Sequence, residues 1–235
     1  MGENRMNNFW TNLLAGLNIF GKHTESTPQA TIQPTPQIPT TVPAQIPIRS
    51  IIYSQTSTEY INLFNTAVVA DPDGADVVVD KIVKYKSIYE EVGIAPWYFV
   101  GCLHHMECDQ DFTAHLYNGD PLTARTVDEP VGRPIAPPDT PNGYSWLFSA
   151  KSALIDDHWD TWSDWSIPGG LYKMEAYNGW GYRLYHSIFS PYLWCGTQYY
   201  KAGKYGSDGH FDPSLVSDQI GVACIIKRMQ DRKLI

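Results

Sequence analysis

A proline-rich stretch divides this chain and limits how much of it can fold into one core. Residues 24–49 contain six prolines, and no charged residue lies between Glu25 and Arg49. Such a composition cannot build a packed core and favours extended, polyproline-like backbone. We therefore predict a Pro/Thr/Gln-rich linker over 24–49, a short segment over 1–23 and one folded domain over 50–235.

The segment 1–23 has a short apolar part, broken by Asn and Gly, that could form an amphipathic helix. Such a helix would dock to a partner or rest on a membrane surface, and the alternative is a poorly ordered tail. It lacks the apolar core and cleavage site of a secretory signal peptide. No run approaches the roughly 20 apolar residues of a membrane-spanning helix, so none is expected.

Charge and cysteine spacing exclude some kinds of partner. The formal net charge is -8, which argues against nucleic acid, because phosphate binding needs a basic surface. The cysteines lack the close pairs of a zinc site, and buried free thiols are expected. His104 and His105 precede Glu107, but the zinc-protease pattern His-Glu-x-x-His is absent. We expect no metal and no cofactor.

Apolar periodicity predicts a mainly helical domain with a Pro- and Gly-rich middle part. Residues 113–143 combine turn signals with short extended pieces, which predicts hairpins and loops. Helices are expected from Thr58, over 75–92, from Pro96 to about Glu107, from Ser145, over 168–177, at Pro191, and from Asp212-Pro213 through Ile226.

Glu107 closes the helix that is expected to start at Pro96. Leu103 lies four residues before it and Val100 seven before it, on the same, apolar helix face. A carboxyl group at the end of a buried face loses water, so its pKa should rise. A carboxylic acid that stays protonated near neutral pH can protonate a leaving sugar oxygen. The alternative is a helix-end Glu that points at solvent or at an Arg.

Asp120 follows in a turn marked by Asn118-Gly119, on a segment that could face the helix end. An ionised Asp across a cleft from a protonated Glu is the pair that glycoside hydrolysis requires. Thr123 and Thr126 could help to hold the attacking water. The alternative for Asp120 is a turn residue that bonds its own backbone.

A third cluster follows the helix expected over 168–177, where Asn178-Gly179 supplies a stop. Aromatic faces and amide groups suit sugar binding, and the alternative is a Gly-rich loop with buried rings. Glu175 could be a second acid, although a surface role is expected. The predicted substrate-binding residues of this cluster are Tyr177, Asn178, Trp180 and Tyr182.

Two further groups of residues have open interpretations. The stretch 156–165 carries acids and Trp residues, and could be a sugar platform, a calcium loop or a loop that packs Trp onto the domain. It does not fit the spacing of an EF-hand, so packing is favoured. Arg125 and Arg133 could bind a sugar carboxylate or phosphate, or pair with Asp128 and Glu129, which is favoured.

Four motifs follow one another along the chain: His104-x-x-Glu107, Asn118-Gly-Asp-Pro-Leu-Thr-Ala-Arg-Thr126, Gly132-Arg-Pro134 and Tyr177-Asn-Gly-x-Gly-Tyr-Arg183. With these motifs the chain resembles lysozyme-type proteins of phages and bacteria over about residues 55–230. Ala176-Tyr-Asn-Gly179 is more distantly similar to the goose-type lysozymes and lytic transglycosylases. The resemblance implies a lysozyme-like α+β domain, mainly helical, with a small hairpin lobe and a substrate cleft. It also implies Glu107 as acid, and peptidoglycan glycan strands as the bound partner.

We therefore expect a muramidase that cleaves the β-1,4 bond between N-acetylmuramic acid and N-acetylglucosamine, with Glu107 as acid and Asp120 as base or charge stabiliser. It would act in the cell wall or periplasm. Before that it would be in the host-cell cytoplasm until lysis, or associated with the virion. Gly179-Trp180 replaces the Ala-Gly of the transglycosylases, and their Gly-Leu-Met-Gln motif is not evident. The alternatives are a lytic transglycosylase that forms 1,6-anhydro products, and a non-catalytic wall-binding or virion structural module.

Overall fold

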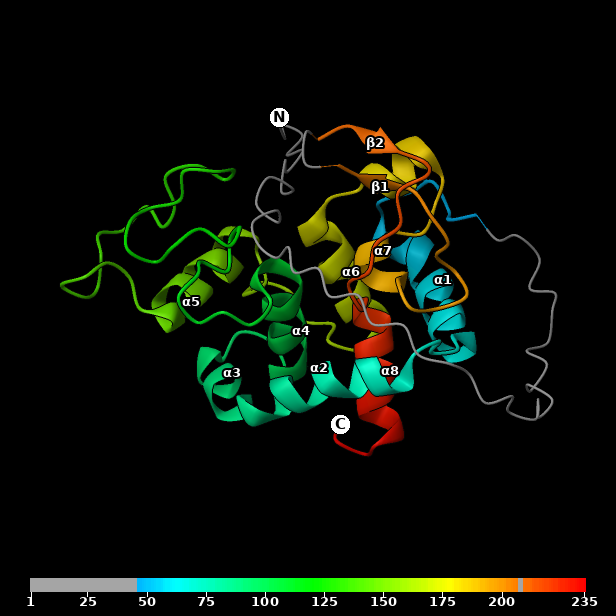
Figure 1. Ribbon diagram of the computed structural model, residues 1–235, viewed down its shortest axis with the longest axis horizontal. Helices are drawn as coiled ribbons and strands as arrows, with labels where there is room; N and C mark the ends of the chain where they lie inside the picture. The colour runs from blue at the N-terminus through cyan, green and yellow to red at the C-terminus, as the bar shows by residue number, and fades with distance from the viewer. Residues whose placement is uncertain (1–45, 207–208) are drawn as a thin grey trace, which may run out of the picture.

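The computed structural model describes residues 46–206 and 209–235. The predictions for 1–23 and for most of the linker lie outside the described residues. The described chain is mainly helical, with a two-stranded antiparallel sheet, as expected for the α+β class (Figure 1). In chain order its elements are α1 (Tyr53–Thr66), α2 (Pro72–Lys84), α3 (Lys86–Val92), α4 (Trp97–Cys108), α5 (Trp146–Asp156), α6 (Ile167–Asn178), the π-helix η1 (Tyr182–His186), α7 (Pro191–Trp194), β1 (Lys204–Tyr205), β2 (Phe211–Asp212) and α8 (Val222–Asp231).

Side-chain caps fix where two of the helices start. Asp71 accepts a 2.9 Å hydrogen bond from the Gly74 N–H at the start of α2, and Ser145 accepts one of 3.3 Å from the Phe148 N–H at the start of α5. Each cap satisfies a backbone donor that has no partner within its helix. The single helix predicted over 75–92 is two helices, because the chain turns at Tyr85 between α2 and α3.

The core lies where α4 crosses the other helices. α4 contacts α2, α3, α6 and α8, while α1 packs on α6 and α2 on α8. Gly170 of α6 makes the α4–α6 crossing close, since a Cβ there would overlap the ring of Phe99 on α4. Small residues at a helix crossing allow this approach. α4 begins at Trp97, directly after Pro96 and one residue later than predicted.

Residues 113–143 contain none of the β-strands, but the turn predicted at Asn118-Gly119 joins two short antiparallel segments, in which the Leu122 N–H donates to the Thr113 carbonyl at 2.9 Å and the His115 N–H to the Asp120 carbonyl at 2.7 Å. Their pairing consists of isolated bridges at Ala114–Pro121 and Thr140–Gly143, and turns held by side chains make up the rest. Figure 1 shows this segment, in green, projecting from the helical body beside α5. The strands are β1 and β2, with Lys204 opposite Asp212.

The last helix starts at Val222, and the predicted start at Asp212-Pro213 is wrong. Asp212 Oδ1 accepts hydrogen bonds from the Ser214 N–H and hydroxyl at 2.7 and 2.6 Å, which closes a local turn in place of a helix. Val216, predicted to lie on the apolar helix face, is 61% exposed.

Glu175 is buried in an ion cluster, so its expected surface position is wrong. Arg183 has no exposed surface, and its Nε and Nη2 donate to the Glu175 carboxylate at 3.0 and 2.8 Å. Arg183 Nη1 donates to Glu59 at 2.5 Å and to the carbonyl of Ile48 at 2.8 Å. The folded domain therefore includes Ile48, two residues before its predicted boundary.

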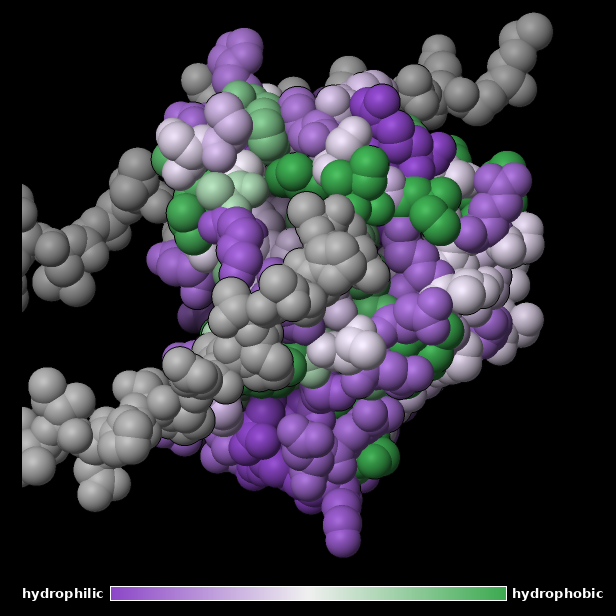
Figure 2. Space-filling model, turned by 90° about the vertical axis from the view of Figure 1, so that its right-hand side faces the viewer, coloured by the Kyte–Doolittle hydropathy of each residue, from purple (hydrophilic) through white to green (hydrophobic). Residues whose placement is uncertain are grey.

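The face on the α1 side carries a broken band of hydrophobic residues across its upper half, above a mainly hydrophilic part (Figure 2). Scattered apolar side chains are normal on a protein surface. Within 46–206 and 209–235, no helix combines the length and apolarity that crossing a bilayer requires.

Candidate active site

The helix α4 places Glu107 inside the protein. Val100 and Leu103, on the same helix face, have no exposed surface, and Glu107 itself is 8% exposed. This confirms the prediction that Glu107 ends a buried apolar face. A carboxyl group in such surroundings has lost most of the water that would stabilise its charge.

The protonation of Glu107 follows from this burial. Loss of water raises the pKa of Glu107 to about 8; the hydroxyl of Tyr192 lowers it, and the negative charge of Asp157 raises it. Tyr192 OH donates to Glu107 Oε1 at 2.6 Å, and Tyr192 is itself buried. Glu107 is therefore mainly protonated at neutral pH, and it neither points at solvent nor pairs with an Arg.

The turn that carries Asp120 packs against the end of α4, as predicted. A Cβ on Gly119, whose φ is +82°, would lie 3.2 Å from the Glu107 carbonyl oxygen. Asp120 is 5% exposed, and its Oδ2 accepts hydrogen bonds from Asn118 Nδ2 and from the N–H groups of Val127 and Asp128 at 2.9, 2.8 and 3.0 Å. Asp120 thus fastens its turn to the following loop.

The two predicted threonines have different surroundings. Thr126 is buried; its hydroxyl donates to the Pro130 carbonyl at 2.5 Å and accepts from the Arg133 N–H at 2.8 Å. It closes the loop on which Pro130 and Arg133 lie. Thr123 lies at the surface, where Gly143 packs against its backbone.

A pocket open to solvent is lined in part by residues from the ends of α5 and α6, and Glu107 is not among its lining residues. Tyr177, at the end of α6, belongs to its lining and donates a 2.9 Å hydrogen bond to the Leu116 carbonyl. Burial, and then the charges of Glu107 and Asp157, raise the pKa of Tyr177. The lining residues are Tyr117, Pro130, Arg133, Ala153, Asp156, Asp157 and Tyr177.

The other predicted sugar-binding residues contact different parts of the protein. Asn178 Nδ2 donates to Ser190 Oγ at 3.4 Å. The Trp180 ring lies 5.2 Å from that of Tyr172. Tyr182, 2% exposed, packs against the aromatic rings of the β1–β2 hairpin. The structure therefore brings Tyr177 to the pocket and does not bring Trp180 or Tyr182 there.

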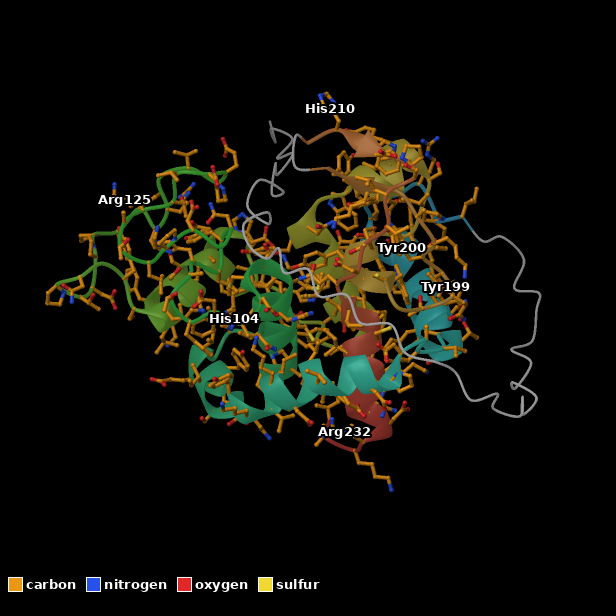
Figure 3. All side chains as sticks on the ribbon, in the orientation of Figure 1. His104, Arg125, Tyr199, Tyr200, His210 and Arg232 are labelled. Carbon is orange, nitrogen blue, oxygen red and sulfur yellow. The ribbon has the colours of Figure 1, made fainter. Side chains whose placement is uncertain are left out.

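The two arginines differ in their partners from the favoured prediction. Arg133 Nη1 lies 3.3 Å from Asp156 Oδ2, on the pocket wall. Arg125 lies on the projecting segment, where Nη2 donates to the Ile135 carbonyl at 2.6 Å and Nε to Tyr144 at 3.3 Å (Figure 3).

Asp157 is a site residue that the sequence reasoning missed. It follows α5 directly, lines the pocket, and its side chain is 30% exposed. Its Oδ2 accepts a 2.9 Å hydrogen bond from Trp159 Nε1 and lies 3.5 Å from Lys173 Nζ. Trp159 is fully buried, so this part of the acidic cluster packs Trp onto the domain, as favoured. The sequence carries no spacing signal that links Asp157 to Glu107.

The histidine before the site belongs to the core. His104 lies inside the helical body (Figure 3), with Nδ1 3.1 Å from Tyr89 OH and Nε2 3.2 Å from the Asp111 carbonyl. Burial lowers the pKa of His104 to about 4, so the ring is neutral. All four cysteines are free thiols, and three of them are buried, as expected. Among the described residues, no three His, Cys, Asp or Glu side chains are grouped as metal ligands would be.

Comparison with known proteins finds no matching family model, no matching curated protein and no matching solved structure. The resemblance to lysozyme-type proteins therefore stays a prediction.

Proposed function

We propose that this protein is a glycoside hydrolase of the lysozyme type, which cleaves the β-1,4 bond between N-acetylmuramic acid and N-acetylglucosamine in peptidoglycan. The observation that carries the proposal is the buried Glu107 carboxyl, whose pKa of about 8 keeps it protonated at neutral pH. A carboxylic acid in this state is the group that glycoside cleavage needs as its proton donor.

The reaction uses one water molecule and one proton donor. Glu107 gives its proton to the glycosidic oxygen as the bond from that oxygen to the anomeric carbon breaks. The oxygen of water forms the new bond to the anomeric carbon, and the proton that it releases passes to an ionised carboxylate. Two aspartates near Glu107 are available for this second role: Asp120 in the turn on α4, and Asp157 at the pocket.

The walls of the pocket suit a sugar chain. Tyr117 and Tyr177 provide aromatic groups, and Asp156, Asp157 and Arg133 provide hydrogen-bonding groups. Aromatic rings combined with a few fixed polar groups are typical of small-ligand sites. The sequence resemblance supports peptidoglycan as the particular glycan, and so does the place of Tyr177, from the Ala-Tyr-Asn segment, in the pocket lining.

Digestion of purified peptidoglycan, with products identified by mass, tests the proposal. We expect reducing-end muropeptides from the wild-type protein and a rate lower by about 10²–10⁴-fold from Glu107→Gln, because acid catalysis contributes this much. Glu91→Gln, at an exposed position on α3, is the matched control and should cleave normally. Equal rates for wild type and Glu107→Gln would refute the proposal, and 1,6-anhydro ends would identify a transglycosylase.

A further inference from the structure

We propose that the pocket binds a zwitterionic α-amino-acid group, in which an ammonium and a carboxylate share one carbon atom. Arg133 would bind the carboxylate of the ligand, and Asp156 and Asp157 would bind its ammonium. The inference rests on the proposed function, because stem peptides of peptidoglycan that contain diaminopimelate carry such a group at the end of that side chain. Stem peptides with lysine end in an ammonium alone, so the pocket would distinguish the two kinds of peptidoglycan.

The guanidinium of Arg133 has donors available on the pocket wall. Its Nη1 lies 3.3 Å from Asp156 Oδ2, and the side chain is 23% exposed. Apart from this ion pair, the guanidinium donates no hydrogen bond to another group among the described residues. A guanidinium carries five N–H donors in a planar fork that matches the two oxygens of a carboxylate. Arg133 can therefore bind a ligand carboxylate without breaking a hydrogen bond of the protein.

The backbone at Arg133 is fixed, and it is connected to the end of α4. The Arg133 N–H donates to Thr126 Oγ1 at 2.8 Å, and the Thr126 N–H donates to the Arg133 carbonyl at 2.8 Å. The next residue, Val127, donates its N–H to Asp120 Oδ2 at 2.8 Å. Asp120 follows the turn that packs against the Glu107 carbonyl. The loop thus holds Arg133 in place beside the segment that carries the proposed acid, as a preorganised site requires.

Two carboxylates from the end of α5 supply the negative part of the pocket. The side chains of Asp156 and Asp157 are 28% and 30% exposed, and both line the pocket. Tyr117 OH donates to Asp156 Oδ2 at 2.8 Å, and Trp159 Nε1 donates to Asp157 Oδ2 at 2.9 Å. These contacts orient the two carboxylates. An ammonium brings three donors, and a carboxylate can accept several hydrogen bonds, so neighbouring carboxylates suit it.

The balance of charge favours a ligand that carries both signs. Arg133 pairs with Asp156, and Lys173, which is not a lining residue, lies with Nζ 3.5 Å from Asp157 Oδ2. The charges of these two pairs cancel. A ligand with a carboxylate alone would be repelled by both aspartates, and one with an ammonium alone would be repelled by both cations. A zwitterionic group is neutral overall and can place each of its charges beside the opposite one.

Calorimetry of the full chain with defined muropeptides tests the inference. The ligands are disaccharide tripeptides that end in meso-diaminopimelate or in L-lysine. Their N-acetylglucosamine is at the non-reducing end, so they lack the linkage that the proposed reaction cleaves. We expect the diaminopimelate ligand to bind about 10–100-fold more tightly, as hydrogen bonds to charged groups allow. Arg133→Met should abolish this preference, and Arg125→Met, on the same projecting segment, should keep it.

Modified ligands make the test independent of whether Arg133→Met folds. Amidation of the side-chain carboxylate of diaminopimelate, or acetylation of its ammonium, should each abolish the tighter binding by the wild-type protein. A loss caused by only one of the two modifications would overturn the zwitterion assignment. Equal affinity of the wild type for both unmodified ligands, or a preference that survives in a folded Arg133→Met, would also overturn it.

Digestion of peptidoglycan is a separate measurement that distinguishes this inference from the proposed function. Product release by a wild-type protein that binds the two ligands equally would overturn this inference alone. A wild-type protein that releases no product would overturn the proposed function, whichever ligand it binds.

Discussion

Tyr192 and Glu107 form a buried pair in which the tyrosine hydroxyl donates to Glu107 Oε1 at 2.6 Å. The tyrosine is 3% exposed and the glutamate 8% exposed. Burial raises the pKa of Glu107, and the hydrogen bond opposes it, with a net value of about 8. The tyrosine therefore sets the upper end of the pH range in which Glu107 carries its proton.

Activity should fall as pH rises through about 8, because Glu107 must be protonated to act as the acid. In Tyr192→Phe the hydrogen bond that lowers the pKa of Glu107 is lost, so this alkaline limb should move to higher pH. The measurement is the pH dependence of peptidoglycan cleavage. Tyr200→Phe also removes a buried hydroxyl, bonded to Ser217, and should leave the limb in place. If the alkaline limb of Tyr192→Phe stays at the same pH or moves to lower pH, the result would contradict the pairing of Tyr192 with Glu107.

Glu107→Gln should make the protein more stable at neutral and alkaline pH. The pKa of Glu107 is raised from 4.5 to about 8, so between these values the folded state holds a proton that the unfolded state has lost. Stability therefore falls as pH rises through this window. Without the carboxyl group this loss disappears, a gain on the order of 2–4 kcal/mol at pH 8. Urea unfolding of the wild type and of Glu107→Gln at pH 5 and pH 8 measures this gain. If the free energy of unfolding changes equally with pH in the two proteins, Glu107 is not the protonated group.

Asp120→Ala should loosen the loop that follows the turn. The Val127 and Asp128 N–H groups, which donate to Asp120 Oδ2 at 2.8 and 3.0 Å, would lose their acceptor. Leaving such donors unpaired costs about 1–3 kcal/mol. Denaturant unfolding measures the loss, and hydrogen exchange should speed up at these two amides. Asp160→Ala, at an exposed position, should change stability by about 0.5 kcal/mol or less.

Arg183→Met should destabilise the domain strongly. It would leave the carboxylates of Glu175 and Glu59, both largely buried, without their guanidinium partner. Removing one member of a buried charge cluster costs about 3–5 kcal/mol. Arg232→Met removes a partly exposed pair with Asp80, at 2.6 Å, and should cost about 0–1 kcal/mol. Similar unfolding midpoints for the two variants would contradict the importance of the cluster.

The helices were predictable where local chemistry fixes them. Ser145 caps α5, and the apolar face at Val100 and Leu103 fixes α4. The prediction failed at Asp212, where a side chain bonds the backbone of Ser214 and the apolar residues that follow lie at the surface. Over 113–143 the predicted turn at Asn118-Gly119 is present, but its antiparallel pairing stops at the bridge Ala114–Pro121 and does not extend into strands.

The candidate site was predictable only in its local part. The burial of Glu107 follows from the residues one and two turns before it. Its partner Tyr192 lies 85 residues further along the chain. Contacts of this range depend on how the helices pack, which the local pattern does not encode. Glu175 was misjudged for the same reason, since its partner Arg183 comes from η1.

The buried cluster at Arg183 also has a mechanical consequence. Ile48, just after the last proline of the linker, accepts a hydrogen bond from Arg183 and donates one to Glu59. Arg183 also donates a hydrogen bond to Glu175 on α6, and the end of this helix supplies Tyr177 to the pocket. Tension applied through the preceding residues would therefore reach α6 through this guanidinium, and also through Tyr172 of α6, whose hydroxyl donates to the Ile51 carbonyl at 2.8 Å. A cargo or tether attached upstream of Ile48 would pull on the same helix that shapes the pocket.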